Sequence, residues 1–215
     1  MYPDPAVLIP TLSVYGASTD PETYFRGHYA AMAVKSQSGA GEREWGIFNA
    51  AFVAAVGVPE EDRAEAAYVL SKTRNAHLWR APIRGSREGL AGLNELGVPI
   101  GIVSNAEGQI ESVLNRMGLC QVGTGPHPSV LCIIDSDVVG VAKPDPAIFE
   151  HALPHLPAVP RERILYVGDS VTMDVGGATA AGLTPVLFDP FDDAAHLFDG
   201  MRIGSLTELL QLFAG

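Results

Sequence analysis

The sequence predicts an α/β fold in which a helical half is followed by a parallel sheet. From about residue 86 onward, short apolar runs alternate with helical patterns, and each run is continuously apolar. Strands of this kind are buried on both faces, as in a parallel sheet that helices cover on both sides. From about residue 20 to residue 79, in contrast, apolar residues recur at helical spacing. We therefore expect an all-helical module before the sheet.

The composition is that of an ordinary protein of modest size. A chain of 215 residues with 47% apolar and 18% charged residues can bury one core and a small additional module. It has no apolar run as long as a membrane span, and its first residues do not resemble a signal peptide, so we expect a cytoplasmic location. The net charge of −11 argues against nucleic acid or an anionic membrane as partner. A phosphorylated substrate stays open, because a metal and one lysine can make a pocket locally positive.

Three or four helices are expected in the first half. Asp20 and Pro21 are typical of a cap and a first turn, and they begin an apolar stripe that runs to Met32. A second stripe runs over residues 45–56 and is ended by Gly57. Pro59, followed by three acids, opens the third helix, because acids are favoured at a helix N-terminus.

The second half is a series of alternating helices and strands. A helix ended by Gly97 leads into the strand VPIGIVSN, and a helix ended by Gly118 follows. The remaining pattern gives the strand VLCIID, the helix DPAIFEHAL, the strand RILYVGD, the helix DVGGATAAG and the strand TPVLFD. Cys120 and Cys132 lack the spacing of a metal site or a disulfide framework, so we expect core residues.

Polar residues follow the predicted strands where a parallel sheet forms its active crevice. Ser104 and Asn105 end one strand, Asp169 ends another, and Lys143 lies just before a helix. Together they suit phosphoryl transfer, in which several oxygens must be neutralised and held in line. Ser104 and the Asn105 N–H can donate to a phosphate, and Lys143 supplies charge. Asp169 offers a hard oxygen to Mg²⁺, and Asp174 can hold a metal-bound water or orient the lysine.

Each of these patterns alone is more often a turn or a helix start, but their combination is specific. The segments IVSNAEG, VAKPDPAIF and ILYVGDSVTMDVGGATAAG resemble the second, third and fourth motifs of the haloacid dehalogenase (HAD) superfamily of hydrolases. The resemblance covers about residues 84 to 190. It implies a Rossmann-like core with an inserted helical cap, Mg²⁺ dependence and, most often, phosphatase activity.

The resemblance also implies roles and boundaries. It assigns phosphate binding to Ser104 and Asn105, charge stabilisation in catalysis to Lys143, and metal binding to Asp169 with support from Asp174. It divides the chain into a remnant of the core's N-terminus (1–17), a helical cap (18–83) and the core (84–215). In the cap, Arg74 and His77 are candidate substrate contacts, with Asn75, Trp79, Arg26 and His28 beside them, although a solvated helix face is the alternative for each.

The family's first motif is missing from this pattern. That motif is a strand ending in Asp-x-Asp, whose first Asp is the nucleophile, but the sole acid before the cap is Asp4, between two prolines. Asp135 and Asp137 form a D-x-D after the second motif, where a strand end and turn is expected. Loss of the first strand, which lies mid-sheet in the family, would leave two inner edges unpaired. The run Ala6 to Ile9 is a candidate to fill the vacancy, although its flanking prolines limit it.

Two functions follow as hypotheses. In the first, Met1 is not the natural start, and the full-length protein is a Mg²⁺-dependent HAD phosphatase of a small phosphorylated metabolite that acts through an aspartyl-phosphate. The chain as given is then expected to be inactive. In the second, the chain is a non-catalytic HAD-like binding or regulatory protein. The sequence leaves a homodimer open.

Overall fold

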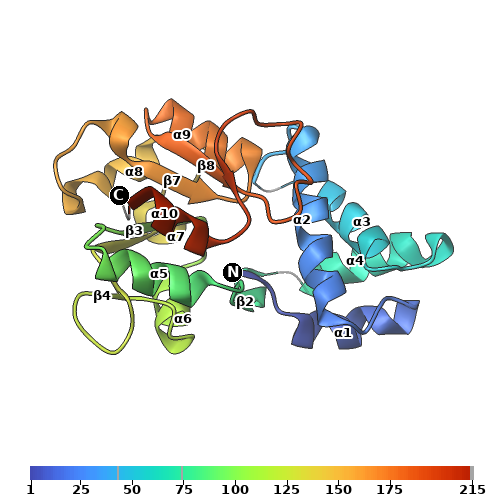
Figure 1. Ribbon diagram of the computed structural model, residues 1–215. Coiled ribbons are helices and arrows are strands. Elements are labelled where there is room, and N and C mark those ends of the chain that lie inside the picture. Colours follow the sequence, from blue (N-terminus) through green and yellow to red (C-terminus); the bar gives the residue numbers. More distant parts are fainter. Residues whose placement is uncertain (43, 74, 214–215) are drawn as a thin grey trace.

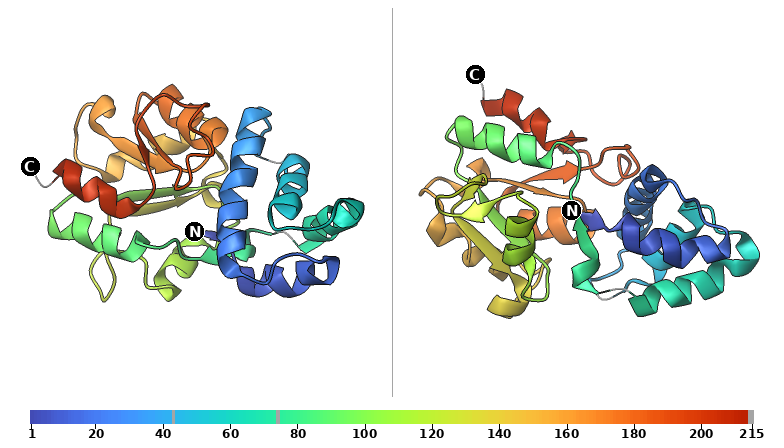
Figure 2. Two further views of the ribbon diagram at one scale, coloured as in Figure 1. Left: turned by 45° about the vertical axis from the view of Figure 1, so that its right-hand side comes forward. Right: turned by 90° about the horizontal axis from the view of Figure 1, so that it is seen from below.

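The computed structural model describes residues 1–42, 44–73 and 75–213. Helices α1 to α4 gather at one end of the molecule, and the strands with the later helices form the other end (Figure 1). Helix α2 (Pro21–Gln37) lies along the boundary between the two parts in both views of Figure 2. Among the described ranges, no helix combines the length and apolar character that a bilayer crossing requires.

The helical module begins where the sequence predicts. Asp20 caps α2 by accepting from the N–H of Glu22 at 3.2 Å, and Pro21 fills the first turn. The turn after the next helix is made at Gly57, whose φ of 92° favours glycine. The module also contains α1 (Pro5–Leu12), η1 (Ser13–Tyr15), α3 (Gly46–Ala55), η2 (Glu60–Asp62), α4 (Arg63–Thr73) and η3 (Ala76–Leu78).

Aromatic rings form the centre of the module. Phe48 and Phe52 stack with centroids 5.6 Å apart, and Tyr24 meets Phe52 edge-on at 5.9 Å. All three rings are buried, together with Leu8 and Leu12 of α1. The N-terminal segment therefore packs with helices α2 to α4.

The suggestion that Ala6 to Ile9 fills a vacancy in the sheet is wrong. These residues belong to α1. Asp4 caps that helix by accepting from the N–H of Ala6 at 2.9 Å, and Pro5 occupies the first turn. Proline at this position favours a helix start and supplies no N–H for a strand ladder, so local chemistry selects the helix.

The second part of the chain has the predicted α/β order. Its strands are β3 (Gly101–Ser104), β6 (Cys132–Asp135), β7 (Leu165–Gly168), β8 (Thr184–Phe188) and β9 (Arg202–Ile203). Its helical segments are α5 (Ser86–Glu95), α6 (Ile110–Arg116), α7 (Ser136–Val139), α8 (Ala147–Glu150), η4 (Leu153–His155), η5 (Arg161–Arg163), the π-helical turn η6 (Val171–Val175), α9 (Gly176–Ala180), η7 (Leu206–Leu209) and α10 (Leu210–Phe213).

The strands pair in parallel, which confirms the predicted fold class. Strand β3 pairs with β6, while β7 pairs with β8 and β8 with β9. No described strand lies between β3 and β7, so the sheet consists of two halves. Short pairs lie outside it: β1 (Tyr2–Pro3) with β2 (Trp79–Ala81), and β4 (Gln121–Val122) with β5 (Ser129–Val130).

The stacked rings of Phe48 and Phe52 predict that removing one ring will strongly destabilise the protein. Phe52→Ala removes a ring that is 1% exposed, and a cavity of this kind destabilises by about 3–5 kcal/mol. Val14→Ala is the matched control, because Val14 is 76% exposed and its loss should change stability by less than about 0.5 kcal/mol. Urea denaturation measures both. Equal effects of the two substitutions would contradict this description of the module's core.

Candidate functional site

The five residues singled out from the sequence lie together at the carboxyl ends of β3 and β7. Ser104, Asn105, Lys143, Asp169 and Asp174 all line one cavity of about 180 Å³. Ser104 and Asn105 also line an adjoining cavity of about 780 Å³. The helical module contributes to both, through Glu42, Trp45 and Trp79.

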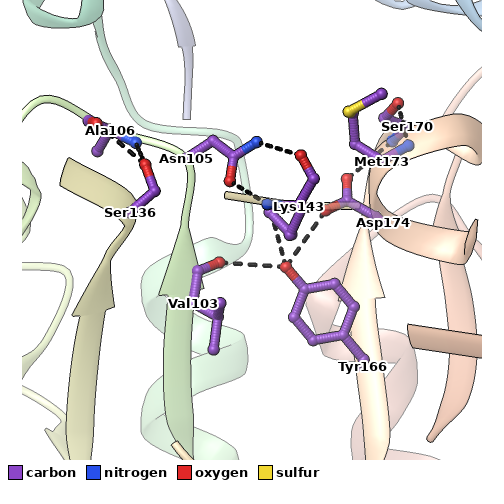
Figure 3. A network of polar contacts seen from close by, with 9 residues as sticks. All are labelled: Val103, Asn105, Ala106, Ser136, Lys143, Tyr166, Ser170, Met173 and Asp174. Atoms are coloured by element: carbon purple, nitrogen blue, oxygen red, sulfur yellow. Dashed lines mark hydrogen bonds and ion pairs between the residues drawn. The ribbon is translucent and has the colours of Figure 1, made fainter. Parts of the chain in front are cut away.

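Lys143 is the centre of a buried polar cluster (Figure 3). Its ammonium donates to Asp174 Oδ1 at 2.7 Å and to the Tyr166 hydroxyl at 2.8 Å. That hydroxyl lies 3.1 Å from the Val103 carbonyl oxygen and 3.2 Å from Asp174 Oδ1, and it can donate to either. The cluster thus links the loop before α8, strands β3 and β7, and the turn η6.

The environment keeps Lys143 charged. Burial by itself lowers the pKa of the ammonium, but the Asp174 carboxylate and Tyr166 more than offset this, and the pKa stands well above its usual value. Burial also raises the pKa of the Tyr166 hydroxyl, which therefore stays protonated. A permanent cation stands at the edge of the cavity as a result.

Asn105 fixes the loop that carries Lys143. Its side-chain oxygen accepts from the Lys143 N–H at 2.8 Å, and its amide nitrogen donates to the Lys143 carbonyl at 3.1 Å. This reciprocal pair joins the end of β3 to the loop before α8. The Asn105 side chain therefore positions Lys143.

Asp174 reaches the cluster because of the local backbone. Its second oxygen, Oδ2, accepts from the N–H of Ser170 at 2.9 Å, while Ser170 itself caps the turn η6. A Cβ at Gly168 would overlap the Asp174 carboxyl group, so the glycine before Asp169 is required by this close approach. Both oxygens of Asp174 have protein partners, and the residue orients Lys143.

Asp169 faces the helical module. Its Oδ2 lies 3.3 Å from Nε2 of His28 on α2, a ring that is 1% exposed, whereas the Asp169 side chain is 30% exposed. Burial raises the pKa of Asp169, but the hydrogen bond and charge of His28, the Met1 α-ammonium and Lys143 together hold it below its usual value. Asp169 is therefore a carboxylate that already has cationic or hydrogen-bonding neighbours.

The described residues offer Mg²⁺ one carboxylate, that of Asp169, and no cluster of metal-binding side chains around it. No group of three or more His, Cys, Asp or Glu side chains in the described ranges could hold a metal ion. Asp169 offers carboxylate oxygen of the kind that Mg²⁺ prefers, whereas the oxygens of Asp174 are taken by Lys143 and Ser170.

Of the other candidates from the sequence, Asn75 lines the larger cavity, His28 the smaller and Trp79 both. His77 is exposed and is not among the described residues that line either cavity. Arg74 lies outside the described residues. The side chain of Arg26 is 59% exposed and lies against Phe191. Asp135 is buried at a strand end, where it caps α7 and accepts from the N–H of Gly108 at 2.9 Å, so this residue is structural. Asp137 of the same D-x-D lines the larger cavity.

The sequence interpretation missed Lys35, Glu42, Trp45 and Tyr166. The Lys35 ammonium is buried 4.1 Å from the centroid of the Trp45 ring. Burial raises the pKa of Glu42, although its hydrogen bond to Asn105 acts in the opposite direction. Lys35 follows His28 and Met32 at helical spacing, so its place on the inner face of α2 could have been inferred.

Comparison with known proteins agrees with the family resemblance of the sequence motifs. Residues 9–182 match the family of haloacid dehalogenase-like hydrolases. The chain is 34% identical to ribulose-1,5-bisphosphate 5-phosphatase of Halopiger xanaduensis over 51% of this chain and 43% of that protein. It is 31% identical to phosphoserine phosphatase of Thermus thermophilus, over 76% of this chain and 62% of that one. It thus spans less than two thirds of either relative.

The fold is also similar to that of solved structures. A HAD phosphatase from Thermococcus onnurineus superposes with a TM-score of 0.55 at 21% identity, over 90% of this chain and 92% of that one. At this identity the likeness concerns the fold alone. It is consistent with the Rossmann-like parallel core.

The buried cluster predicts unequal effects of two substitutions. Asp174→Asn leaves the Lys143 ammonium without its counter-charge and should destabilise the protein by about 3–5 kcal/mol. Tyr166→Phe removes one hydroxyl and should destabilise it by about 1–3 kcal/mol. Glu150→Gln, in the exposed pair with Arg161, is the control and should lie within about 1 kcal/mol of the unsubstituted protein.

The pH dependence of the destabilisation by Asp174→Asn follows from the raised pKa of Lys143. Because the pKa of Lys143 is higher in the folded protein than in the unfolded chain, the charged lysine stabilises the fold. This stabilisation is fully present below the pKa of lysine in the unfolded chain, about 10.4, and is lost as the pH rises above that value. The loss caused by Asp174→Asn should therefore be constant between about pH 6 and about pH 9. Urea denaturation at several pH values measures it. A loss that disappears within this range would show that Lys143 titrates there.

Proposed function

Because the chain belongs to the family of haloacid dehalogenase-like hydrolases, we propose that its site serves a phosphatase of small phosphorylated metabolites. The observation that carries this proposal is the convergence of Ser104, Asn105 and Lys143 around one cavity with Asp169. Two curated relatives are phosphatases of different metabolites, and a phosphate monoester is the feature common to their substrates. The proposed substrate class is therefore a phosphate monoester.

The groups on β3 and before α8 suit the phosphate. Lys143 offers a cation that stays charged at any working pH, and its position is fixed by Asp174 and by the backbone pair with Asn105. The Ser104 hydroxyl and the Asn105 N–H are the proposed donors to phosphate oxygens. Donors and cations that are held in place before the ligand arrives stabilise phosphate charge without reorganisation.

Mg²⁺ is the proposed cofactor of the complete catalytic set. When bound, such an ion neutralises phosphate charge as a Lewis acid. Asp169 would provide one of its oxygen ligands, with Asp174 holding Lys143 beside it. No further His, Cys, Asp or Glu side chain in the described ranges completes a ligand group with it, so we derive no step through the metal.

The cavity that Lys143 lines contains no described carboxylate that is placed to attack phosphorus, and Glu107 and Asp137 line only the adjoining cavity. The acids that line the 180 Å³ cavity are Glu42, Asp169 and Asp174. Asp174 is bound to Lys143, Asp169 lies against His28, and Glu42 is partly buried with a raised pKa. Covalent catalysis needs an activated nucleophile within reach of the phosphorus atom. We therefore propose that residues 1–215 alone bind phosphate monoesters with little or no turnover.

A second function, ligand binding without catalysis, is favoured by one observation. The contact between His28 and Asp169 occupies one oxygen of the carboxylate that would bind a metal, as expected of a site that holds a ligand without a metal. Lys35, Trp45 and Trp79 line the same cavity and would contact the part of the ligand beyond the phosphate. The two functions differ in turnover and share phosphate binding.

Turnover is tested by phosphate release from a panel of phosphate monoesters with Mg²⁺. The chain should release phosphate no faster than its Asp169→Asn variant, because the cavity that Lys143 lines has no described carboxylate placed to attack phosphorus. Robust Mg²⁺-dependent release that Asp169→Asn abolishes would contradict this expectation and favour a complete enzyme.

Phosphate binding is tested by thermal shift and calorimetry with inorganic phosphate. Phosphate should raise the melting temperature, and Ser104→Ala should weaken its binding about tenfold, the effect of losing one hydrogen bond to a charged group. Ser112→Ala is the control, because the Ser112 hydroxyl donates to the Gln109 carbonyl on an exposed part of α6. A melting temperature that phosphate leaves unchanged would remove the support for both functions.

A further inference from the structure

Helix α2 contributes a buried cation to the small cavity of the site. His28, Met32 and Lys35 follow one another at helical spacing on this helix, and all three line the cavity of about 180 Å³. Lys35 is only 2% exposed, and lysine is seldom buried to this extent. The helical module therefore places a positive charge at the wall of the proposed phosphate site.

The Trp45 ring holds this charge at the cavity wall. The Lys35 ammonium lies 4.1 Å from the centroid of Trp45, and both residues line the cavity. An ammonium over the face of a tryptophan is attracted by the ring, most strongly where water is excluded. Phe48 and Trp79 pack against the same tryptophan, with centroids 5.4 Å and 5.5 Å away. Lys35 is thus held in place before a ligand arrives.

Packing alone does not account for a lysine at this position. A buried charge is unfavourable unless it is compensated, and an apolar side chain of similar volume often serves a buried position equally well or better. A methionine would pack α2 against Trp45 without that penalty. The charge of Lys35 at the wall of a cavity therefore indicates a role in binding an anion.

Lys35 and Lys143 line this cavity from different parts of the molecule. Lys143 belongs to the loop before α8, is bound to Asp174, and is the proposed cation for the phosphate. Lys35 lies in the last turn of α2. Both lysines act to lower the pKa of Glu42, but burial has the larger effect and raises it. The Glu42 charge is therefore disfavoured, which leaves a place for an anion of the ligand beside Lys35.

We propose that Lys35 binds a carboxylate of the ligand, so that the substrate class is a phosphate monoester that also carries a carboxylate. This inference rests on the proposed phosphate site, in which Lys143 and Ser104 hold the phosphate. The cavity that both lysines line, at about 180 Å³, lies below the range of roughly 300–1,000 Å³ that drug-sized ligands need. The two anionic groups are therefore separated by only a few atoms, and a carboxylate is more compact than a second phosphate.

Calorimetry with two matched ligands, without Mg²⁺, tests this inference. 3-Phosphoglycerate and glycerol 3-phosphate carry the same phosphate and differ at one carbon, which is a carboxylate in the first and a hydroxymethyl group in the second. The unsubstituted protein should bind 3-phosphoglycerate at least about tenfold more tightly, the effect of one hydrogen bond between charged groups.

Removal of the Lys35 charge should abolish this preference. Lys35→Met should bring the affinities for the two ligands to within about threefold of each other, by weakening the binding of 3-phosphoglycerate. Lys72→Met is the matched control, because the Lys72 ammonium also lies against an aromatic ring, 5.0 Å from the centroid of Tyr68, but is exposed on α4. This control should keep the tenfold preference. If Lys35→Met fails to fold, Lys35→Gln removes the charge and keeps a polar end.

The ligand pair distinguishes a failure of this inference from a failure of the phosphate site. If inorganic phosphate and both esters fail to bind, the phosphate site itself is wrong, and the inference falls with it. If both esters bind equally well to the unsubstituted protein, the phosphate site stands and the carboxylate contact is wrong. If Lys35→Met weakens both esters and inorganic phosphate to the same extent, Lys35 binds the phosphate, which also overturns the inference.

Discussion

The cluster of Lys143, Tyr166 and Asp174 holds the site and the two half-sheets together. Its members come from the loop before α8, from β7 and from η6, and Tyr166 extends it to the Val103 carbonyl of β3. In a continuous sheet, ladder hydrogen bonds would fix the distance between β3 and β7. Here side chains make that connection at the carboxyl ends of the strands, next to the cavity. The stability of the fold and the geometry of the site therefore depend on the same contacts.

The parts of the structure that the sequence could predict follow from rules of short range or of topology. Continuous apolar runs indicated parallel strands, and the carboxyl-end rule placed Ser104, Lys143 and Asp169 together although they are far apart in the chain. The start of α2 could be predicted from Asp20 and Pro21, because helix capping depends on the local sequence.

The features that the sequence predicted wrongly or missed have identifiable physical causes. A run of four apolar residues such as Ala6 to Ile9 fits a strand or a helix, and the cap formed by Asp4 decided in favour of the helix. The contact of His28 with Asp169 joins residues from two modules, and no local pattern reveals such a contact. Tyr166 was part of an apolar strand in the sequence, and only the gap between β3 and β7 gives its hydroxyl a role.

The gap between β3 and β7 adjoins the proposed phosphate site. A site with a fixed cation and phosphate donors, but without a placed nucleophile, suits binding more than turnover, and no described strand lies between β3 and β7 beside it. Amide hydrogen exchange along β7 tests this central claim most directly. The amides of Leu165 and Val167 should exchange much faster than those of Tyr166 and Gly168, which point toward β8. Equal protection of all four amides would show that β7 is paired on both edges and would contradict the account.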